Sequence, residues 1–133
     1  LNMALDSNTE MRRVFLRAVH VFQVQTSFTA LANAQGKVEE RLARWLLMAQ
    51  DRVRKDRLNL THEFLALMLG VRRAGVTIAM HDLEKRGVVT GLRGTVTIRD
   101  RAGLKEMASG FYGQPEAEFE RLFPQAAREY QEV

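Results

Sequence analysis

Cysteine is absent from the 133 residues, and there are only two prolines and one tryptophan. Without cysteine the chain has no disulfide, no thiol nucleophile and no zinc site built on thiolates. This composition fits a reducing compartment, and we expect a cytoplasmic protein. No apolar run is long enough to cross a bilayer and no secretory signal pattern is present, so no membrane partner is expected.

Patterns typical of catalysis are also missing. The three histidines, at positions 20, 62 and 81, fall on separate predicted elements. His62-Glu63 begins like a zinc-protease motif, but no second histidine follows at the required spacing. No glycine pattern forms a phosphate-binding loop. We therefore expect no enzyme activity, no metal site and no cofactor in this chain.

The charge is unevenly distributed. Residues 52–101 carry 11 basic and 5 acidic side chains, whereas residues 102–133 carry 3 basic and 6 acidic ones. A basic middle third suggests a polyanion as partner, although a solvated basic face without a partner is an equal alternative. The content of hydrophobic residues, 46%, is enough for the packed core of about one globular domain. Because the first residue is Leu1 and not Met, we expect a fragment of a longer protein.

A long helix is predicted from Thr9 to about Asn33, a stretch without glycine or proline. Steps of three and four predict a heptad seam, which suits a homodimer interface, and a polar Gln in the seam can fix its register. A second stripe, Phe15, Val19 and Phe22, suits a domain outside this sequence. The alternative is a core helix of a single domain. The seam consists of Met11, Val14, Ala18, Val21, Gln25, Phe28 and Ala32.

Gly36 ends this helix, and a second amphipathic helix is predicted after it. We expect Trp45 to lie in the core and the basic stretch 52–57 to form a loop. The predicted apolar side of the helix consists of Val38, Leu42, Trp45, Leu46, Ala49 and Val53.

Residues 60–89 predict a helix-turn-helix. Thr61 is an N-cap candidate, and Gly70 suits the left-handed position just past the end of the first helix. That short helix is expected to bury Leu65, Met68 and Leu69. The second helix runs from about Arg72 to Arg86 and is stopped by Gly87, with Val76, Ala79, Met80 and Leu83 facing inward and Arg72, Arg73, Thr77, Ile78 and His81 facing outward.

After Gly87 the period changes to two, which predicts a β-hairpin of strands 88–90 and 95–98 around a turn at 91–94. Val96 and Ile98 are expected to face inward, and Thr95, Thr97 and Arg99 outward. A small hairpin after such a helix is a wing, so the fold class is mainly α with a β-hairpin wing. Asp100 caps a helix at 101–108, and an acidic helical tail follows, interrupted at Pro124.

This arrangement points to double-stranded DNA. A helix that opens on two arginines can reach guanine edges or phosphates, and Ile78 can contact a thymine methyl or be partly buried. A helix N-terminus at Thr61 can bind phosphate, and the wing can contact the flanking backbone. For each residue alone, a solvated polar group is the competing interpretation. The DNA-binding candidates are Thr61, Arg72, Arg73, Thr77, Ile78, Arg93 and Thr95.

Three stretches together resemble the Crp/Fnr family of bacterial transcription regulators, similar to the cyclic AMP receptor protein. They are Val38–Leu47, Leu60–Ala66 with Leu69-Gly70-Val71-Arg72-Arg73, and Asp100–Leu104, while residues 9–33 resemble the dimerisation helix of the family. The resemblance implies a homodimer on a pseudo-palindromic promoter site and RNA polymerase as a further partner. It also implies a sensory β-barrel, absent from this sequence, that would bind an effector such as a cyclic nucleotide.

By this resemblance residues 1–36 are the dimerisation segment and residues 37–133 the DNA-binding segment. It places the base-reading arginine at Arg73 and backbone contacts at Thr61, Arg72 and the wing around Arg93 and Gly94. The cyclic AMP receptor protein has a glutamate where this chain has Ala74 and an arginine where it has Ile78, which implies a different operator or one that is read less strongly by hydrogen bonds. A winged helix that binds a protein partner is the alternative function.

Overall fold

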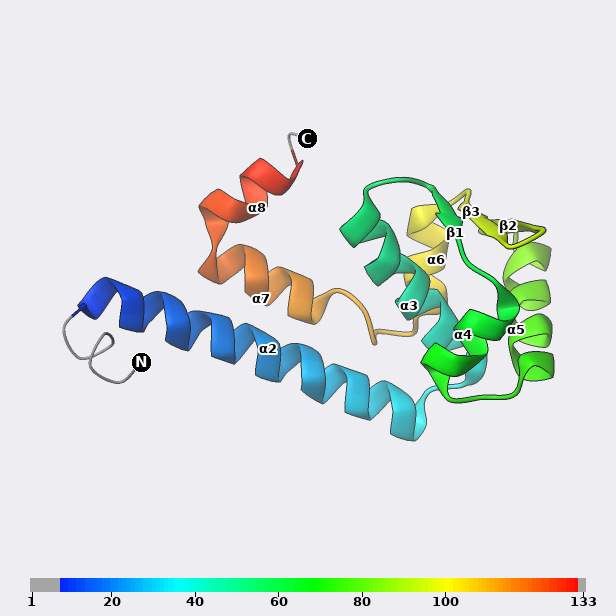
Figure 1. Cartoon of the computed structure of the whole chain (residues 1–133), viewed down its shortest axis with the longest axis horizontal. Coiled ribbons are helices and arrows are strands. Elements are labelled where there is room, and N and C mark those ends of the chain that lie inside the picture. The colour runs from blue at the N-terminus through cyan, green and yellow to red at the C-terminus, as the bar shows by residue number, and fades with distance from the viewer. Residues whose placement is uncertain (1–7, 132–133) are drawn as a thin grey trace. The chain divides into compact units, whose positions relative to one another are not determined.

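The computed structural model describes residues 8–131, which divide into two compact units. One unit contains residues 31–112, and the other combines the residues up to 30 with those from 113 onward. The fold is mainly helical with one small antiparallel sheet (Figure 1). The elements are α2 (Thr9–Gln35), α3 (Val38–Val53), β1 (Arg57–Asn59), α4 (His62–Leu69), α5 (Arg73–Lys85), β2 (Val89–Leu92), β3 (Thr95–Ile98), α6 (Arg101–Met107), α7 (Gln114–Leu122) and α8 (Pro124–Gln131).

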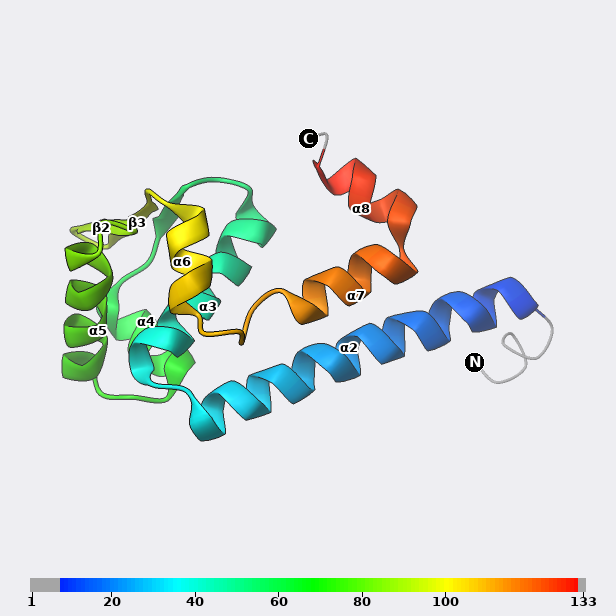
Figure 2. The same ribbon diagram turned by 180° about the vertical axis from the view of Figure 1, so that it is seen from behind.

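The unit of residues 31–112 has one hydrophobic core. Helix α3 packs against both α5 and α6, and it lies beside α6 in both views of the ribbon (Figures 1 and 2). The predicted inward face of α5 is buried throughout, because apolar residues recur there at helical spacing. The largest fully buried side chains are Leu42, Leu46, Leu47, Leu65, Met80, Leu83, Leu104, Val76 and Val96.

Helices α4 and α5 form the predicted helix-turn-helix, with an angle of 106° between them. Gly70 has φ +65° and ends α4 in the left-handed conformation, where its N–H bonds back to the carbonyls of the last turn. Arg41 of α3 donates a hydrogen bond to the Leu69 carbonyl at the same end. The turn is thus closed by a glycine and by a side chain from a neighbouring helix.

The wing contains a strand that the sequence did not predict. Residues Arg57–Asn59, expected at the end of a loop, form β1 and pair with β3, so the sheet has the order β1-β3-β2. The predicted turn was also too long, because Gly91 and Leu92 extend β2, and only Arg93 and Gly94 connect the strands. Both have positive φ, +41° and +74°, as a two-residue hairpin loop requires.

One burial prediction was wrong, and two residues of the predicted apolar side of α3 are not fully buried. Met68 is 46% exposed, because it lies on the solvent side of the short helix α4. Val53 is 53% exposed, since it is the last residue of α3 and extends past the core. Trp45 is only partly buried and contacts the ring of Phe64 edge-on, with 5.9 Å between ring centroids.

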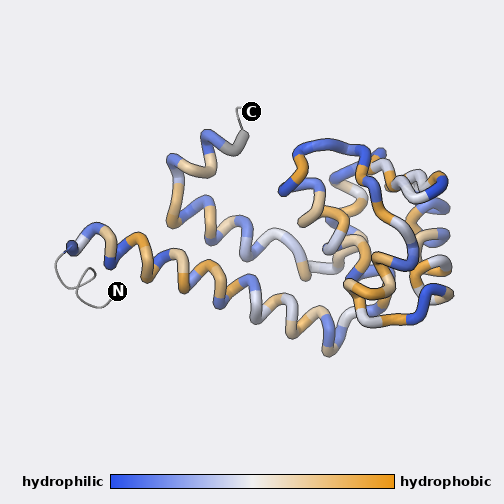
Figure 3. The backbone as a smooth tube through the Cα atoms, viewed as in Figure 1, coloured by the Kyte–Doolittle hydropathy of each residue, from blue (hydrophilic) through white to orange (hydrophobic). Residues whose placement is uncertain are grey.

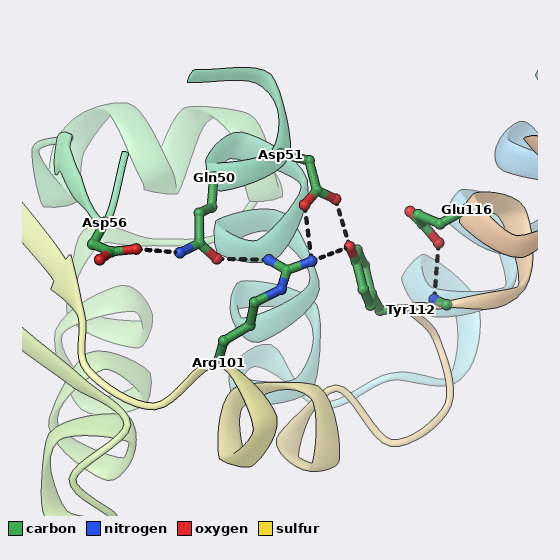
Figure 4. A network of polar contacts seen from close by, with 7 residues as sticks. Gln50, Asp51, Asp56, Arg101, Tyr112 and Glu116 are labelled. Carbon is green, nitrogen blue, oxygen red and sulfur yellow. Dashed lines mark hydrogen bonds and ion pairs between the residues drawn. The ribbon is translucent and has the colours of Figure 1, made fainter. Parts of the chain in front are cut away.

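A polar network joins α3, β1 and α6 (Figure 4). Arg101 donates hydrogen bonds to Gln50, to Asp51 and to the Tyr112 hydroxyl, at 2.6, 2.8 and 2.7 Å. The Tyr112 hydroxyl donates to Asp51 at 2.5 Å, and Gln50 donates to Asp56 at 2.7 Å, just before β1. These groups satisfy one another and hold the start of β1 against the helical core.

The second unit combines α2, up to residue 30, with α7 and α8. Hydrophobic and hydrophilic residues are interleaved along α2 (Figure 3). His20 of α2 and Glu118 of α7 are in contact, with 3.0 Å between Nε2 and Oε1. Two hydrogen bonds from Arg121 to Glu118 are the main reason that the pKa of this carboxyl falls from 4.5 to about 2. Among residues 8–131, no single helix is long and apolar enough to span a membrane.

Candidate nucleic-acid interface

The outward face of α5 carries five of the residues predicted to face solvent. Arg72, Arg73, Thr77, Ile78 and His81 are all exposed, while the opposite face is in the core. Ile78 is 66% exposed, which removes the alternative of partial burial and leaves an apolar side chain in solvent. An exposed isoleucine between polar neighbours is suited to contact a methyl group of thymine.

The N-terminus of α5 is rich in positive charge. Arg72 is the N-cap residue and makes no side-chain cap, and the first turn contains no acidic residue. The free N–H groups and the positive end of the helix dipole therefore lie beside two exposed guanidinium groups. Anions such as phosphate or electronegative base edges are favoured at this position.

Thr77 is held in place by a partner that the sequence did not reveal. Its hydroxyl lies 3.1 Å from the Arg73 carbonyl and 3.0 Å from Nδ1 of His62 at the start of α4. A hydroxyl donates only one hydrogen, so a bond from Thr77 to the Arg73 carbonyl requires that His62 Nδ1 donate to Thr77. His62 thus connects the two helices at the exposed face.

Thr61 is the N-cap of α4, as predicted, and its hydroxyl accepts a hydrogen bond from Phe64 N at 3.1 Å. Replacing it with alanine leaves that donor without a side-chain acceptor and should cost about 0.5–2 kcal/mol in the free energy of unfolding. Urea denaturation measures the loss. Thr61→Ser keeps the acceptor and is the control. Equal destabilisation by both variants would contradict the capping role.

The wing presents Arg93 at its tip in a conformation that is unfavourable for a residue with a Cβ. A non-glycine residue at φ +41° carries local strain, and such strain is concentrated at functional positions. Next to it, Thr95 is partly exposed on the outer face of the sheet. Arg93 was predicted from its position in the hairpin, and the structure places it between β2 and β3.

The outer face of the sheet extends this polar surface. The register aligns Arg57 of β1 with Thr97, and Thr97 with Thr90, all on the side away from the core. Arg99 donates a hydrogen bond to the Thr90 hydroxyl at 3.2 Å. Because residues 52–57 were predicted to form a loop, Arg57 was not recognised as part of this surface. Only its strand pairing places it beside the wing.

A cleft of about 480 Å³ lies between α5 and the wing. Its walls contain residues of both elements that were predicted to bind DNA, together with two histidines and one carboxylate, that of Glu84. The structure therefore brings together Thr77 and Ile78 of α5 with Arg93 and Thr95 of the wing. The lining residues are Leu60, His62, Thr77, Ile78, Met80, His81, Glu84, Gly91, Leu92, Arg93, Gly94, Thr95 and Val96.

The predicted dimer seam on α2 varies in exposure along its length. Met11, Val14 and Ala18 are exposed, whereas Val21, Gln25 and Phe28 are half-buried. Ala32, which belongs to the unit of residues 31–112, is buried within the chain, with 2% exposure. The second stripe is exposed, at 43% for Phe15, 37% for Val19 and 68% for Phe22. The free apolar surface is therefore greatest in the first half of the helix.

Comparison with known proteins identifies the class of this fold. Residues 40–107 match the model of the Crp-like helix-turn-helix domain, which is about half of the chain. The chain therefore belongs to this family, as its sequence predicted. Among curated proteins, none matches the sequence significantly.

Three solved structures are similar. The catabolite activator protein of Thermus thermophilus is 27% identical, with a TM-score of 0.53, and the match covers 74% of this chain and 46% of that one. A protein from Eubacterium rectale assigned to the Crp/Fnr family of transcriptional regulators is 23% identical over 80% and 46% of the two chains, with a TM-score of 0.57. A Crp-family regulator of Thermus thermophilus is 24% identical over 75% and 48%, with a TM-score of 0.51.

At 23% and 24% identity, the last two structures show a similarity to this chain in fold alone. This chain spans less than half the length of all three structures. No group of three or more histidine, aspartate or glutamate side chains that could hold a metal ion occurs in the described part of the chain.

Proposed function

We propose that this chain binds double-stranded DNA sequence-specifically and regulates transcription. The observation that carries the proposal is the exposed face of α5, which begins with two arginines and presents Thr77 and Ile78 beside a wing with Arg93 at its tip. A recognition helix reads base edges near its N-terminus, and basic groups around it hold the phosphates. Membership of the Crp-like family supports the same function.

The roles of the residues divide by position. Arg73 is the first residue of α5 and is proposed to read a guanine in the major groove. Arg72, one residue earlier, and Thr61, at the start of α4, are proposed to contact phosphates together with Arg93 and Thr95. Thr77, fixed by His62, is proposed to contact a phosphate or base one helical turn from Arg73. Donation to a phosphate requires its hydroxyl to release the Arg73 carbonyl. Ala74 offers no polar group to the bases. Fewer hydrogen bonds are therefore available to specify the operator than with a polar residue at this position.

The active form is proposed to be a homodimer on a pseudo-palindromic promoter site. The exposed apolar residues of the first half of α2 support this, because a helix with such a surface is stabilised by a partner helix. Residues 1–36 would then form the dimerisation segment and residues 37–133 the DNA-binding segment. The whole protein is proposed to act with RNA polymerase in the bacterial cytoplasm, with an effector bound by a sensory domain outside this sequence.

One observation favours a protein-binding module as the second candidate. Phe64, Leu67 and Met68 of α4 are 40%, 74% and 46% exposed, and they lie on one side of the helix. An apolar patch of this kind is typical of protein interaction surfaces. If this is the main function, the chain will show no measurable affinity for duplex DNA at low salt.

Arg93→Asn tests the contact of the wing with the DNA backbone. Asparagine tolerates the left-handed conformation better than arginine, so the turn should keep its shape while the cation is lost. Binding should weaken for all sequences alike, and the slope of log K against log salt should become about 0.9 less steep, the value for one phosphate contact. Fluorescence anisotropy at four salt concentrations measures both. An effect confined to one base position would contradict a backbone role.

A further inference from the structure

Glu84 is the one carboxylate among the residues that line the cleft between α5 and the wing. In a cleft proposed to face a duplex, a negative charge repels the phosphates and weakens binding. The carboxylate is half-buried, and its Oε1 accepts a hydrogen bond from the backbone N–H of Gly91 at 2.7 Å. This bond joins the recognition helix directly to the wing.

Gly91 lies on β2, an edge strand of the sheet that pairs only with β3. The N–H groups on the free side of an edge strand lack partners from the sheet. Here the side chain of α5 supplies the acceptor, and a hydrogen bond to an ionised carboxylate is stronger than one between neutral groups.

The close approach also explains why residue 91 is a glycine. A Cβ atom at this position would lie 3.0 Å from Glu84 Oε1 and 3.8 Å from Met80 Cγ. A side chain there would crowd the carboxylate and displace it by a few tenths of an ångström from its position at the Gly91 N–H. Glycine in a strand often marks such an approach. The pair Glu84 and Gly91 is therefore a fitted contact between α5 and the wing.

We propose that Glu84 is a positioning residue that holds the wing against α5, so that Arg93 and the recognition helix engage one duplex together. The proposal rests on the DNA-binding function given above. Gly91 lies two residues before Arg93, so the hydrogen bond fixes the strand that leads into the wing tip. Without it, β2 keeps its pairing with β3, but the loop that carries Arg93 is held less firmly against α5.

The test compares Glu84→Ala, Glu84→Gln, Arg93→Asn and the double variant Glu84→Ala/Arg93→Asn. Glutamine keeps an Oε1 acceptor and removes the charge, whereas alanine removes both. Dissociation constants for one duplex are measured at several salt concentrations. Amide exchange at Gly91 is followed by NMR in the free proteins, and thermal melting verifies that all variants are folded.

Glu84→Ala should bind roughly two- to fivefold more weakly than Glu84→Gln, which removes the same charge, as expected for the loss of one exposed ionic contact, and its salt slope should be about 0.9 less steep. The double variant should bind no more weakly than Arg93→Asn, because both changes remove the same contact. Glu84→Gln should retain the wild-type slope and bind at least as tightly as the wild type. The Gly91 amide should exchange faster only in the two variants with alanine at position 84.

Effects that multiply in the double variant, or a Glu84→Gln protein as weak as Glu84→Ala, would overturn the positioning role. A Gly91 amide that stays protected in Glu84→Ala would overturn the hydrogen bond itself. A wild-type protein that binds no duplex would refute the proposed function. In that case, faster exchange at Gly91 in Glu84→Ala would leave Glu84 with a structural role only.

Discussion

Leu65→Ala should lower the free energy of unfolding by about 2–5 kcal/mol, the range expected for truncating a fully buried leucine. Leu65 of α4 is fully buried in the hydrophobic core, where the helix-turn-helix packs against the rest of the unit. Its truncation removes apolar contacts and leaves a cavity that the two short helices cannot close. Urea denaturation, followed by far-ultraviolet circular dichroism, measures the change.

Leu67→Ala is the matched control, because it makes the same chemical change two residues further along the same helix. Leu67 is 74% exposed, and its loss should change stability by no more than about 0.5 kcal/mol. If the two variants are equally destabilised, α4 does not pack in the orientation described. A stable Leu67→Ala protein that also keeps its DNA affinity would show that the apolar patch on α4 is not needed for binding DNA.

Arg73→Ala should weaken binding to the preferred operator by about 1–3 kcal/mol and relax the preference at one base pair. Arg73 opens α5, its side chain is exposed, and no acidic residue in the first turn competes for it. A guanidinium group here can bond guanine O6 and N7 together, which alanine cannot do. Titration of the preferred duplex and of its single-base variants measures both effects.

Arg86→Ala controls for the loss of a positive charge, since Arg86 is exposed at the other end of the same helix. Arg86→Ala should slightly weaken binding to all DNA sequences and leave the base preference unchanged. Arg73→Lys extends the test, because an ammonium group keeps the charge but lacks the planar fork of arginine. If Arg73→Ala and Arg86→Ala behave alike, Arg73 is not the base-reading residue.

The helices of this chain were predictable because each depends on local signals. The start of α4 at Thr61, its end at Gly70 and the inward face of α5 follow from capping, left-handed glycine and 3.6-residue periodicity. These signals act within a few residues of one another, so a single sequence contains them. Two short helices on either side of a tight turn with Gly70 then predicted one helix-turn-helix motif.

The features that the sequence did not reveal depend on residues far apart in the chain. β1 has only three residues and forms because Leu58 pairs with Val96. From the sequence alone, Gly91 is assigned to the turn, because no local pattern shows that Glu84 lies close to it. Met68 fits the apolar pattern of α4, but the neighbouring elements cover the opposite side of the helix. Pairing and packing decide these positions, and neither is a local property.

The candidate site shows the same contrast. The predicted side chains on α5 are exposed as expected, whereas the supports beneath them were not foreseen. His62 contacts Thr77, and Glu84 contacts the wing, across spacings that no motif links. Sequence patterns thus indicated which side chains are exposed on α5, and the structure adds the contacts that hold them there.

Selection of binding sites from random duplex DNA tests the central claim most directly. The account predicts that the wild-type chain enriches a defined sequence, with two half-sites in inverted orientation if it binds as a dimer. Arg73→Ala should lose the preference at one position of each half-site and keep the rest. Failure of the wild-type chain to enrich any sequence, at a salt concentration where it is folded, would contradict sequence-specific DNA recognition.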